Sequence, residues 1–231
     1  MTHDFDKAYW EQKHQDESHA SESAGTGETP PHPYLAAETA GLTPGTALDA
    51  GCGTGAEAVW LAANGWQVTG ADISDTALAR AAARADAAGV TDTVRWVLAD
   101  LTAWEPERTF ELITSSYTHP NIPQLDFYEH IARWVAPGGT LLIIGHLHDD
   151  AAGHGHGHGT EPAGHEHGVH EHGGHDENPP AKATVTLADI RERLASAGWV
   201  IETAEEHDRT LTSPGGRAVS LRDVVVRARR G

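Results

Sequence analysis

The sequence of 231 residues predicts one three-layer α/β domain with a mostly parallel sheet. Short apolar, β-branched segments alternate with segments of helical periodicity, and this alternation favours parallel strands joined by helical crossovers. The first strand runs into a glycine-rich turn, Gly51-Cys52-Gly53-Thr54-Gly55, that opens a helix. The last two strand-like segments are joined by a link too short for a crossover, which predicts that they run antiparallel.

The N-terminal 34 residues are expected to form a helical cap and a polar linker. Residues 4–14 show helical periodicity, and Asp4 at their start can accept hydrogen bonds from the first free N–H groups. Residues 15–32 lack apolar periodicity and end in two prolines, so they predict a linker without regular structure. Residues 35–231 then form the main domain.

Three aromatic residues in and after this cap leave two interpretations open. Tyr9, Trp10 and Tyr34 could form a lid over a binding site. Equally, they could pack as core residues against the edge of the sheet.

The main domain alternates strands and helices along the chain. Strands are expected where short apolar runs are bounded by turn residues, and helices where apolar residues recur every three to four positions. Gly89 is a favourable residue just past the end of the long Ala-rich helix, and Thr186-Leu187-Ala188-Asp189 fits a capping box. The expected strands are 46–51, 67–73, 94–100, 110–116, 140–146, 199–206 and 219–228, and the expected helices are 57–64, 75–88, 125–135 and 186–198.

Charge and composition restrict the function classes. The formal charge is −18 with histidines neutral, so a phosphate backbone would be repelled and nucleic acid is not expected as a partner. No apolar run approaches the ~18 residues of a membrane span, and the N-terminus lacks the basic start and apolar core of a signal peptide. The single Cys52 cannot form an internal disulfide and fits a reducing cytoplasm, which is the expected location.

The glycine-rich turn points to a bound nucleotide but leaves its identity open. Glycines allow positive φ and close approach of a ligand to the backbone, and the following helix N-terminus offers unpaired N–H groups. The run from Gly51 to Ala56 also satisfies the loose dinucleotide pattern, so an NAD-dependent enzyme is one alternative. A phosphate-binding P-loop is excluded because no Gly-Lys-Ser/Thr follows.

Three carboxylates at strand ends narrow the choice of ligand. Asp49, just before the glycines, can neutralise a cationic ligand, whereas a pyrophosphate would gain nothing there. Asp72 ends the second strand, where a carboxylate can bind ribose hydroxyls. Asp100 ends the third strand and can accept a hydrogen bond from an adenine amine. A sugar, a base and a positively charged tail together describe S-adenosylmethionine.

These residues resemble the cofactor site of class I S-adenosylmethionine-dependent methyltransferases. The run Asp49-Ala50-Gly51-Cys52-Gly53-Thr54-Gly55 carries the resemblance, together with Asp72 and Asp100. Residues 134–144 resemble the segment of these methyltransferases that leads into their fifth strand. The resemblance covers 45–146 and, through topology, 186–229. It implies a Rossmann-like fold with seven strands in the order 3-2-1-4-5-7-6, the seventh antiparallel.

The resemblance also implies roles for single residues. The three glycines of the turn would line the methionine part, Asp72 would take the ribose, and Ile73 would pack on the adenine face. Tyr9-Trp10-Glu11 and the fifth-strand region are loosely similar to small-molecule methyltransferases of the thiopurine and tellurite-resistance type. The expected cofactor-binding residues are Asp49, Gly51, Cys52, Gly53, Gly55, Asp72, Ile73, Asp100, Leu101 and Ser116.

Methyl transfer from a sulfonium requires positioning more than acid–base chemistry. The segment after the fourth strand, 115–120, lies at the carboxyl edge of the sheet, which faces the ligand crevice. There His119 could accept a proton from the acceptor and Tyr117 could orient it; alternatively, His119 is a turn residue before a proline. The segment departs from the Asn/Asp-Pro-Pro-Tyr motif of nucleic-acid amino methyltransferases. We therefore predict methylation of a small molecule.

A histidine-rich insertion, 147–182, interrupts the main domain after the fifth strand. Neutral imidazole is a common ligand of nickel and zinc, so the insertion could bind a divalent metal and cover the acceptor pocket. It could also be a low-complexity expansion without a role. A metal-handling or metal-sensing protein without catalysis is therefore the competing function. The candidate metal ligands are His154, His156, His158, His165, His167, His170, His172 and His175.

Overall fold

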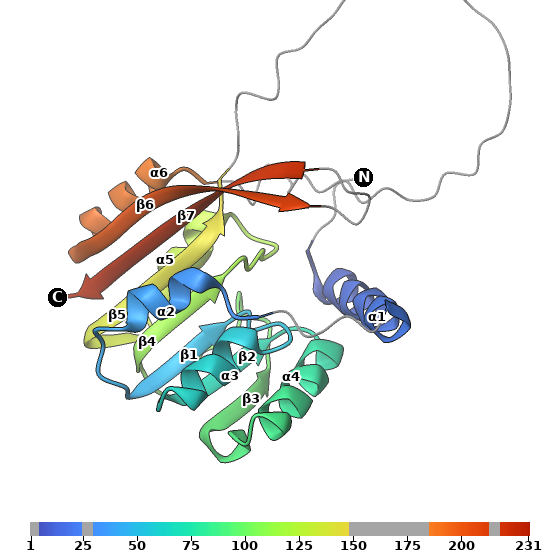
Figure 1. The fold of residues 1–231 in the computed structure, drawn as a ribbon. Coiled ribbons are helices and arrows are strands. Elements are labelled where there is room, and N and C mark those ends of the chain that lie inside the picture. Colours follow the sequence, from blue (N-terminus) through green and yellow to red (C-terminus); the bar gives the residue numbers. More distant parts are fainter. Residues whose placement is uncertain (1–4, 25–29, 148–184, 213–217) are drawn as a thin grey trace, which may run out of the picture.

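The computed structural model describes residues 5–24, 30–147, 185–212 and 218–231. They form one seven-stranded sheet with helices on both faces (Figure 1). The strands are β1 (Thr46–Ala50), β2 (Gln67–Asp72), β3 (Val94–Leu98), β4 (Phe110–Ser116), β5 (Val135–His146), β6 (Trp199–Thr212) and β7 (Ala218–Arg230). The helices are α1 (Lys7–Ala24), α2 (Pro33–Thr39), α3 (Ala56–Ala63), α4 (Asp75–Ala87), α5 (Gln124–Ala132) and α6 (Leu187–Ser196), with a 3₁₀ turn, η1, at Thr91–Thr93.

The strand order is β3-β2-β1-β4-β5-β7-β6, which confirms the expected Rossmann-like topology. β1 lies between β2 and β4 and pairs with both in parallel, so that Asp49 is level with Gly70 and Thr114. β7 runs antiparallel to both of its neighbours, β5 and β6. The carboxyl ends of the central parallel strands therefore open on one edge of the sheet, where such sheets bind ligands.

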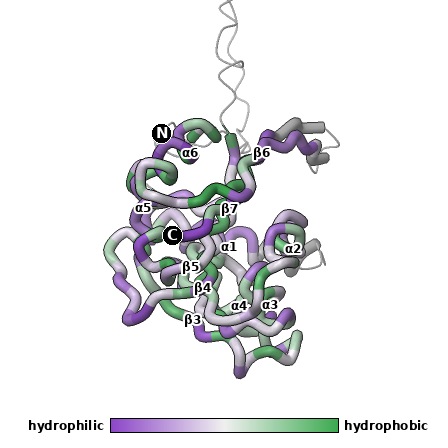
Figure 2. The backbone as a smooth tube through the Cα atoms, turned by 90° about the vertical axis from the view of Figure 1, so that its left-hand side faces the viewer, coloured by the Kyte–Doolittle hydropathy of each residue, from purple (hydrophilic) through white to green (hydrophobic). Residues whose placement is uncertain are grey.

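Two apolar cores hold the sheet between its helices. On one face α5 and α6 bury Phe127, Ile131 and Leu194 against the strands. On the other face α2 and α3 bury Leu35 and Leu61. Figure 2 shows the same division from the side, with α5 and α6 on one side of the strands and α2, α3 and α4 on the other. Each fully buried large side chain stabilises the fold by roughly 1.5–3 kcal/mol, so both layers fix the strand ends in place.

Two helix signals in the sequence are confirmed. Gly89 follows α4 with φ of 68°, and the N-cap of this helix, which was not predicted, is Ser74, whose side chain accepts from Ala77 N. Thr186 and Asp189 form the reciprocal capping box at the start of α6. Such caps satisfy N–H groups that have no partner within the helix.

The N-terminal helix is longer than the sequence predicts. We expected a helix over 4–14 and a linker from residue 15, whereas α1 continues to Ala24, so the linker prediction is wrong for 15–24. Pairs one turn apart on α1, such as Gln12 with Asp16, support a helix that has no apolar stripe. The start is also different, because Asp6 accepts from Tyr9 N, while Asp4 lies outside the described residues. A second helix, α2, was not expected. It begins at Pro33 and crosses the expected boundary at residue 34 between the N-terminal segment and the main domain.

β5 begins earlier than predicted. We expected a helix over 125–135 and a strand from residue 140, but α5 ends at Ala132 and β5 begins at Val135. The pairing with β4 shifts between Phe110 and Leu112, so the Pro-Gly-Gly segment forms an irregular part of the strand. A Cβ on Gly139 would lie 2.9 Å from the main-chain oxygen of Glu111, which explains a glycine at this close approach.

β6 and β7 extend beyond the expected 199–206 and 219–228. The sequence did not predict the full length of β6, because its charged residues do not resemble a strand; in the structure they pair across the ladder, as Glu206 does with Arg222.

No helix within the described ranges combines the length and apolar character needed to cross a membrane. The eight candidate histidine ligands of the insertion lie outside the described residues, and within those residues no group of three or more His, Cys, Asp or Glu is placed to hold a metal ion.

Candidate active site

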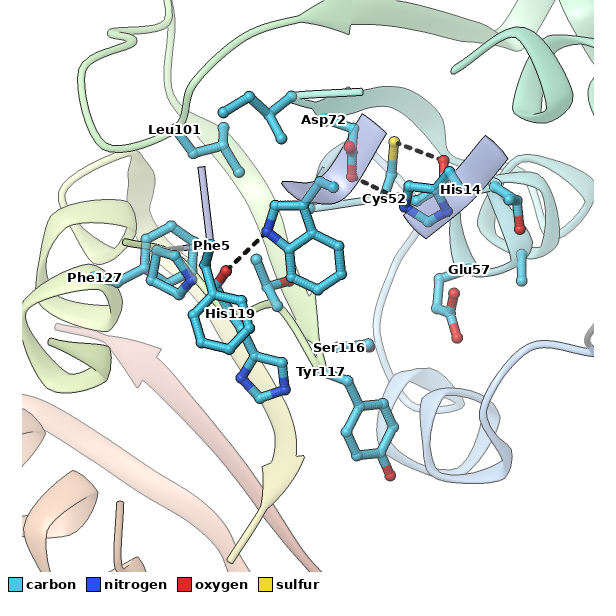
Figure 3. A pocket seen from close by; sticks show the side chains of 18 of the residues that line it. Phe5, His14, Cys52, Glu57, Asp72, Leu101, Ser116, Tyr117, His119 and Phe127 are labelled. Carbon is cyan, nitrogen blue, oxygen red and sulfur yellow. Dashed lines mark hydrogen bonds between the residues drawn. The ribbon is translucent and has the colours of Figure 1, made fainter. Parts of the chain in front are cut away.

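A cavity of about 430 Å³ opens at the carboxyl ends of the central strands. The glycine-rich turn and the residues after β2 and β3 form one side, and the segment after β4 forms the other. In Figure 3, Asp72, Cys52 and His14 lie on one side of the cavity, while Phe5, His119 and Phe127 gather on the opposite side. Of the expected cofactor-binding residues, those that line the cavity are Gly51, Cys52, Gly53, Asp72, Ile73, Asp100, Leu101 and Ser116.

The three glycines of the turn serve different purposes, although all have positive φ. A Cβ on Gly51 would overlap the side chain of Thr118, and one on Gly55 would lie 2.8 Å from Ala81, so both glycines are required by packing. A Cβ on Gly53 would meet no atom within 4 Å. Gly53 therefore leaves an open surface of backbone toward which a ligand can approach.

Asp72 ties this turn to the end of β2. Its Oδ2 accepts a hydrogen bond from Gly53 N at 2.8 Å, and its Oδ1 accepts from Ser74 N at 2.9 Å. Each carboxylate oxygen can accept more than one hydrogen bond, so Asp72 is fixed by the backbone and can still receive hydroxyl donors from a ligand.

Asp49 lies beneath the turn and does not line the cavity, and neither does Gly55. The Asp49 side chain is 1% exposed and accepts from the Thr114 hydroxyl at 3.0 Å. Burial raises the pKa of Asp49 to about 8, and the nearby carboxylate of Glu57 acts in the same direction. Any action of Asp49 on a cationic ligand is therefore exerted through the turn, and such a cation would lower this pKa.

The adenine-side residues lie beyond the end of β3. Asp100 is exposed, and its Oδ1 accepts from Thr102 N and the Thr102 hydroxyl, which leaves the other carboxylate oxygen for a ligand. Leu101 is buried beside it. Cys52 also lines the cavity, but burial raises the pKa of its thiol well above the ordinary value, so it is not a nucleophile at neutral pH.

The opposite side of the cavity carries Tyr117 and His119. The Tyr117 hydroxyl lies 2.8 Å from His32 Nε2, and burial raises its pKa far above the ordinary value, so the phenol keeps its proton. Burial lowers the pKa of His119 to about 4, with nearby His146 acting in the same direction, so this imidazole is neutral at pH 7. The buried atoms His119 Nδ1 and Ser116 Oγ make no hydrogen bond within the described part of the chain.

The positions of Tyr9 and Trp10 on α1 and of Tyr34 on α2 distinguish between the two interpretations of these aromatic residues. Trp10 lines the cavity and its indole donates to the main-chain oxygen of His119 at 3.3 Å. Tyr9 and Tyr34 do not line it. Tyr34 packs against the core on the α2–α3 face and stacks on His207 at a ring distance of 4.5 Å. Of the three aromatic residues, Trp10 alone lines the cavity, as the lid interpretation requires.

A charged cluster that the sequence did not predict lies next to Tyr117. Asp223 on β7 is fully buried and accepts from Arg209 Nε at 2.5 Å and from His146 Nδ1 at 3.2 Å. Arg209 and His32 line the cavity. Burial favours the protonated form of Asp223, but these two hydrogen bonds outweigh it and the pKa is lowered. A carboxylate inside the apolar run of β7 was the available signal.

Comparison with known proteins identifies the domain around this cavity. Residues 47–139 match the family model described as a methyltransferase domain. This part of the chain is similar to class I S-adenosylmethionine-dependent methyltransferase domains. The match begins on β1 and ends in the irregular segment of β5, so it includes the glycine-rich turn and the ends of β2, β3 and β4.

Proteins similar to this chain are found by comparing sequences and by comparing structures. Probable thiol methyltransferase 2 of Arabidopsis thaliana is 32% identical over 130 residues, which cover 53% of this chain and only 57% of that protein. TehB from Haemophilus influenzae has a TM-score of 0.65 at 17% identity, over 91% of this chain and 65% of that one. A DhpI–SAH complex has a TM-score of 0.58 at 20% identity, over 97% and 95%. The two solved structures support the fold.

Proposed function

We propose that this protein transfers a methyl group from S-adenosylmethionine to a small-molecule acceptor. The observation that carries the proposal is the contact between Asp72 and Gly53 N, which places a carboxylate against the open backbone of the turn inside the methyltransferase domain. A carboxylate at the end of β2 suits ribose hydroxyls. DhpI, a protein of this fold, has been solved as a complex with SAH, which supports a cofactor of the same kind here.

The residues around the cavity fit such a cofactor. Asp72 would hold the ribose, Ile73 would pack on the adenine, and Asp100 would accept from the adenine amine at its unengaged oxygen. Ser116 Oγ, buried and without a hydrogen-bond partner in the described residues, supplies a further polar group to the ligand. The open face of Gly53 leaves room for the methionine part.

When bound, S-adenosylmethionine would supply an electrophilic methyl group to the acceptor, and its sulfur would keep the electron pair of the methyl–sulfur bond. The chain's own contribution is alignment and exclusion of water, which can account for about 7–11 kcal/mol of the barrier. His119 is neutral at pH 7 and takes the proton of an acceptor that must lose one. Tyr117 keeps its proton and orients the acceptor.

The acceptor class is suggested by a relative in sequence. The Arabidopsis relative is named as a probable thiol methyltransferase, and small thiols are therefore the first acceptors to test. The competing function, a metal-handling protein without catalysis, is favoured only by the histidine-rich insertion. A metal-handling protein without catalysis would have no need of a carboxylate such as Asp72 fixed at a ribose site.

The test is isothermal calorimetry with S-adenosylmethionine, followed by assay of labelled methyl transfer to a panel of small thiols. We expect binding, and we expect Asp72→Asn to weaken it at least about tenfold because the amide opposes a backbone N–H and loses the charged acceptor. Asp86→Asn is the matched control, since Asp86 is exposed on α4 and does not line the cavity. Equal binding by all three proteins would contradict the proposed cofactor site.

A further inference from the structure

Charges of opposite sign line opposite sides of the cavity. On the side of the glycine-rich turn lie the carboxylates of Asp72 and Asp100, whereas Glu57, which also lines the cavity, accepts a hydrogen bond from His32 N. On the other side lies Arg209, which is the one Lys or Arg among the described residues that line the cavity. In a chain of net charge −18, an anion reaches this cavity against a repulsive field, so a local cation is needed to hold it there.

Arg209 is fixed in position. Its Nε donates to Asp223 Oδ2 at 2.5 Å, and its Nη2 donates to the Tyr117 hydroxyl at 3.3 Å. The guanidinium carbon lies 5.5 Å from the centre of the Tyr117 ring. Because Asp223 is fully buried, one end of the guanidinium is anchored in the sheet, while the side chain remains 28% exposed.

Arg209 has N–H donors beyond those that its contacts with Asp223 and Tyr117 engage in the described residues. A guanidinium has five N–H donors, and the two contacts above engage two of them. Asp223 is also bound by His146, and His32 Nε2 lies 4.0 Å from it. The remaining N–H groups of Arg209 thus suit a second, external carboxylate or similar anion, which an arginine can bind through two parallel hydrogen bonds.

We propose that Arg209 selects the methyl acceptor and that this acceptor carries an anionic group. The inference rests on the proposed function, because it assigns the acceptor side of the same cavity. Asp223 acts as the positioning residue, and Tyr117 and His32 form the polar wall beside the anion. The other half of the cavity, proposed for the cofactor, is lined by carboxylates, which would repel the anionic group of such an acceptor.

The experiment compares phenylacetate with phenylacetamide, a neutral analogue of nearly the same shape, on protein saturated with S-adenosylhomocysteine. Binding of each probe is followed by NMR titration of the full chain. We expect phenylacetate to bind at least about tenfold more tightly than phenylacetamide. We expect Arg209→Met to abolish this preference, while Arg229→Met retains it. Arg229 lies on the neighbouring strand, pairs with Glu202 and does not line the cavity.

The outcomes separate this inference from the proposed function. Failure of wild-type protein to bind S-adenosylhomocysteine contradicts the proposed function. Normal binding of S-adenosylhomocysteine with no preference for phenylacetate, or with no detectable binding of either probe, overturns only the role of Arg209. A preference that persists in Arg209→Met also overturns it. Because Arg209→Met could unfold the protein, Arg209→Lys serves as a second variant, and it should keep the charge but lose most of the preference.

Discussion

The carboxylate of Glu11 on α1 accepts a hydrogen bond from the hydroxyl of Ser74 at 2.7 Å, and Ser74 is both the N-cap of α4 and a donor to Asp72. Glu11 also accepts from the side chain of Thr76. The covering helix is thus anchored at the start of α4, where a negative charge is favourable. Ser74 therefore contacts both the covering helix α1 and Asp72 of the proposed ribose site.

Removing this anchor is expected to weaken cofactor binding without unfolding the sheet. Glu11→Ala removes the contacts of α1 with Ser74 and Thr76, so the cover opens more often and S-adenosylhomocysteine binds about tenfold more weakly. Gln12→Ala is the control, because it removes a hydrogen bond within α1, to Asp16, and leaves the contacts of α1 with Ser74 and Thr76 in place. Calorimetry measures the affinity, and hydrogen exchange measures the opening of α1. Unchanged exchange and affinity in Glu11→Ala would contradict the anchor.

The anchor is also expected to resist acid. Hydrogen bonds from Thr76 and Ser74 lower the pKa of Glu11 to about 2. A carboxyl whose pKa is depressed in the folded state contributes stability that is present above its ordinary pKa and is lost as the pH falls toward 2. The protection of α1 in hydrogen exchange should therefore persist at pH 5 and decline below about 4. A decline already between pH 7 and 5 would show that another group anchors α1.

Gly53 offers a substitution that separates ligand binding from folding. Gly53→Ala meets no neighbouring atom and costs only the strain of positive φ, about 1 kcal/mol, but its methyl group occupies the surface proposed for the cofactor. Gly89→Ala is the matched control, because Gly89 also has positive φ and open space but lies at the end of α4. Thermal unfolding should shift similarly in both variants, whereas only Gly53→Ala should lose S-adenosylhomocysteine binding.

His119 should leave a signature in the pH dependence of stability. Its pKa is lowered from 6.5 to about 4, so between these values the unfolded chain binds a proton that the folded protein does not. Stability should therefore fall as the pH drops through this window, by at most about 3 kcal/mol from this group. His119→Gln should flatten the profile and reduce methyl transfer with little change in cofactor affinity. An unchanged turnover would eliminate His119 as the proton acceptor.

The histidine-rich insertion is tested by deletion. If it binds nickel or zinc, calorimetry should detect metal binding by the full chain and not by a variant lacking residues 150–179. If the bound metal also alters access to the acceptor pocket, turnover should respond to metal only in the full chain. The same response in both proteins would contradict a role for the insertion.

The sequence predicts the parallel core of this fold well, because its strands are short apolar runs and because β1 runs into Gly51 and β2 ends at Asp72. The capping box that starts at Thr186 and the antiparallel β7 were predicted as well, whereas the cap at Ser74 was not. The second half of α1 was missed, because pairs of polar residues stabilise it in place of an apolar stripe. Arg209, Asp223 and His32 were missed because Arg209 and Asp223 meet across the β6–β7 ladder, while His32 reaches them from the start of α2.

The assignment of the cavity to S-adenosylmethionine is tested by calorimetric titration of the full chain with S-adenosylhomocysteine and, separately, with NADH. We expect saturable binding of S-adenosylhomocysteine that Asp72→Asn weakens, and no comparable binding of NADH. Tight binding of NADH, with none of S-adenosylhomocysteine, would contradict the assignment of the cavity to an adenosyl sulfonium.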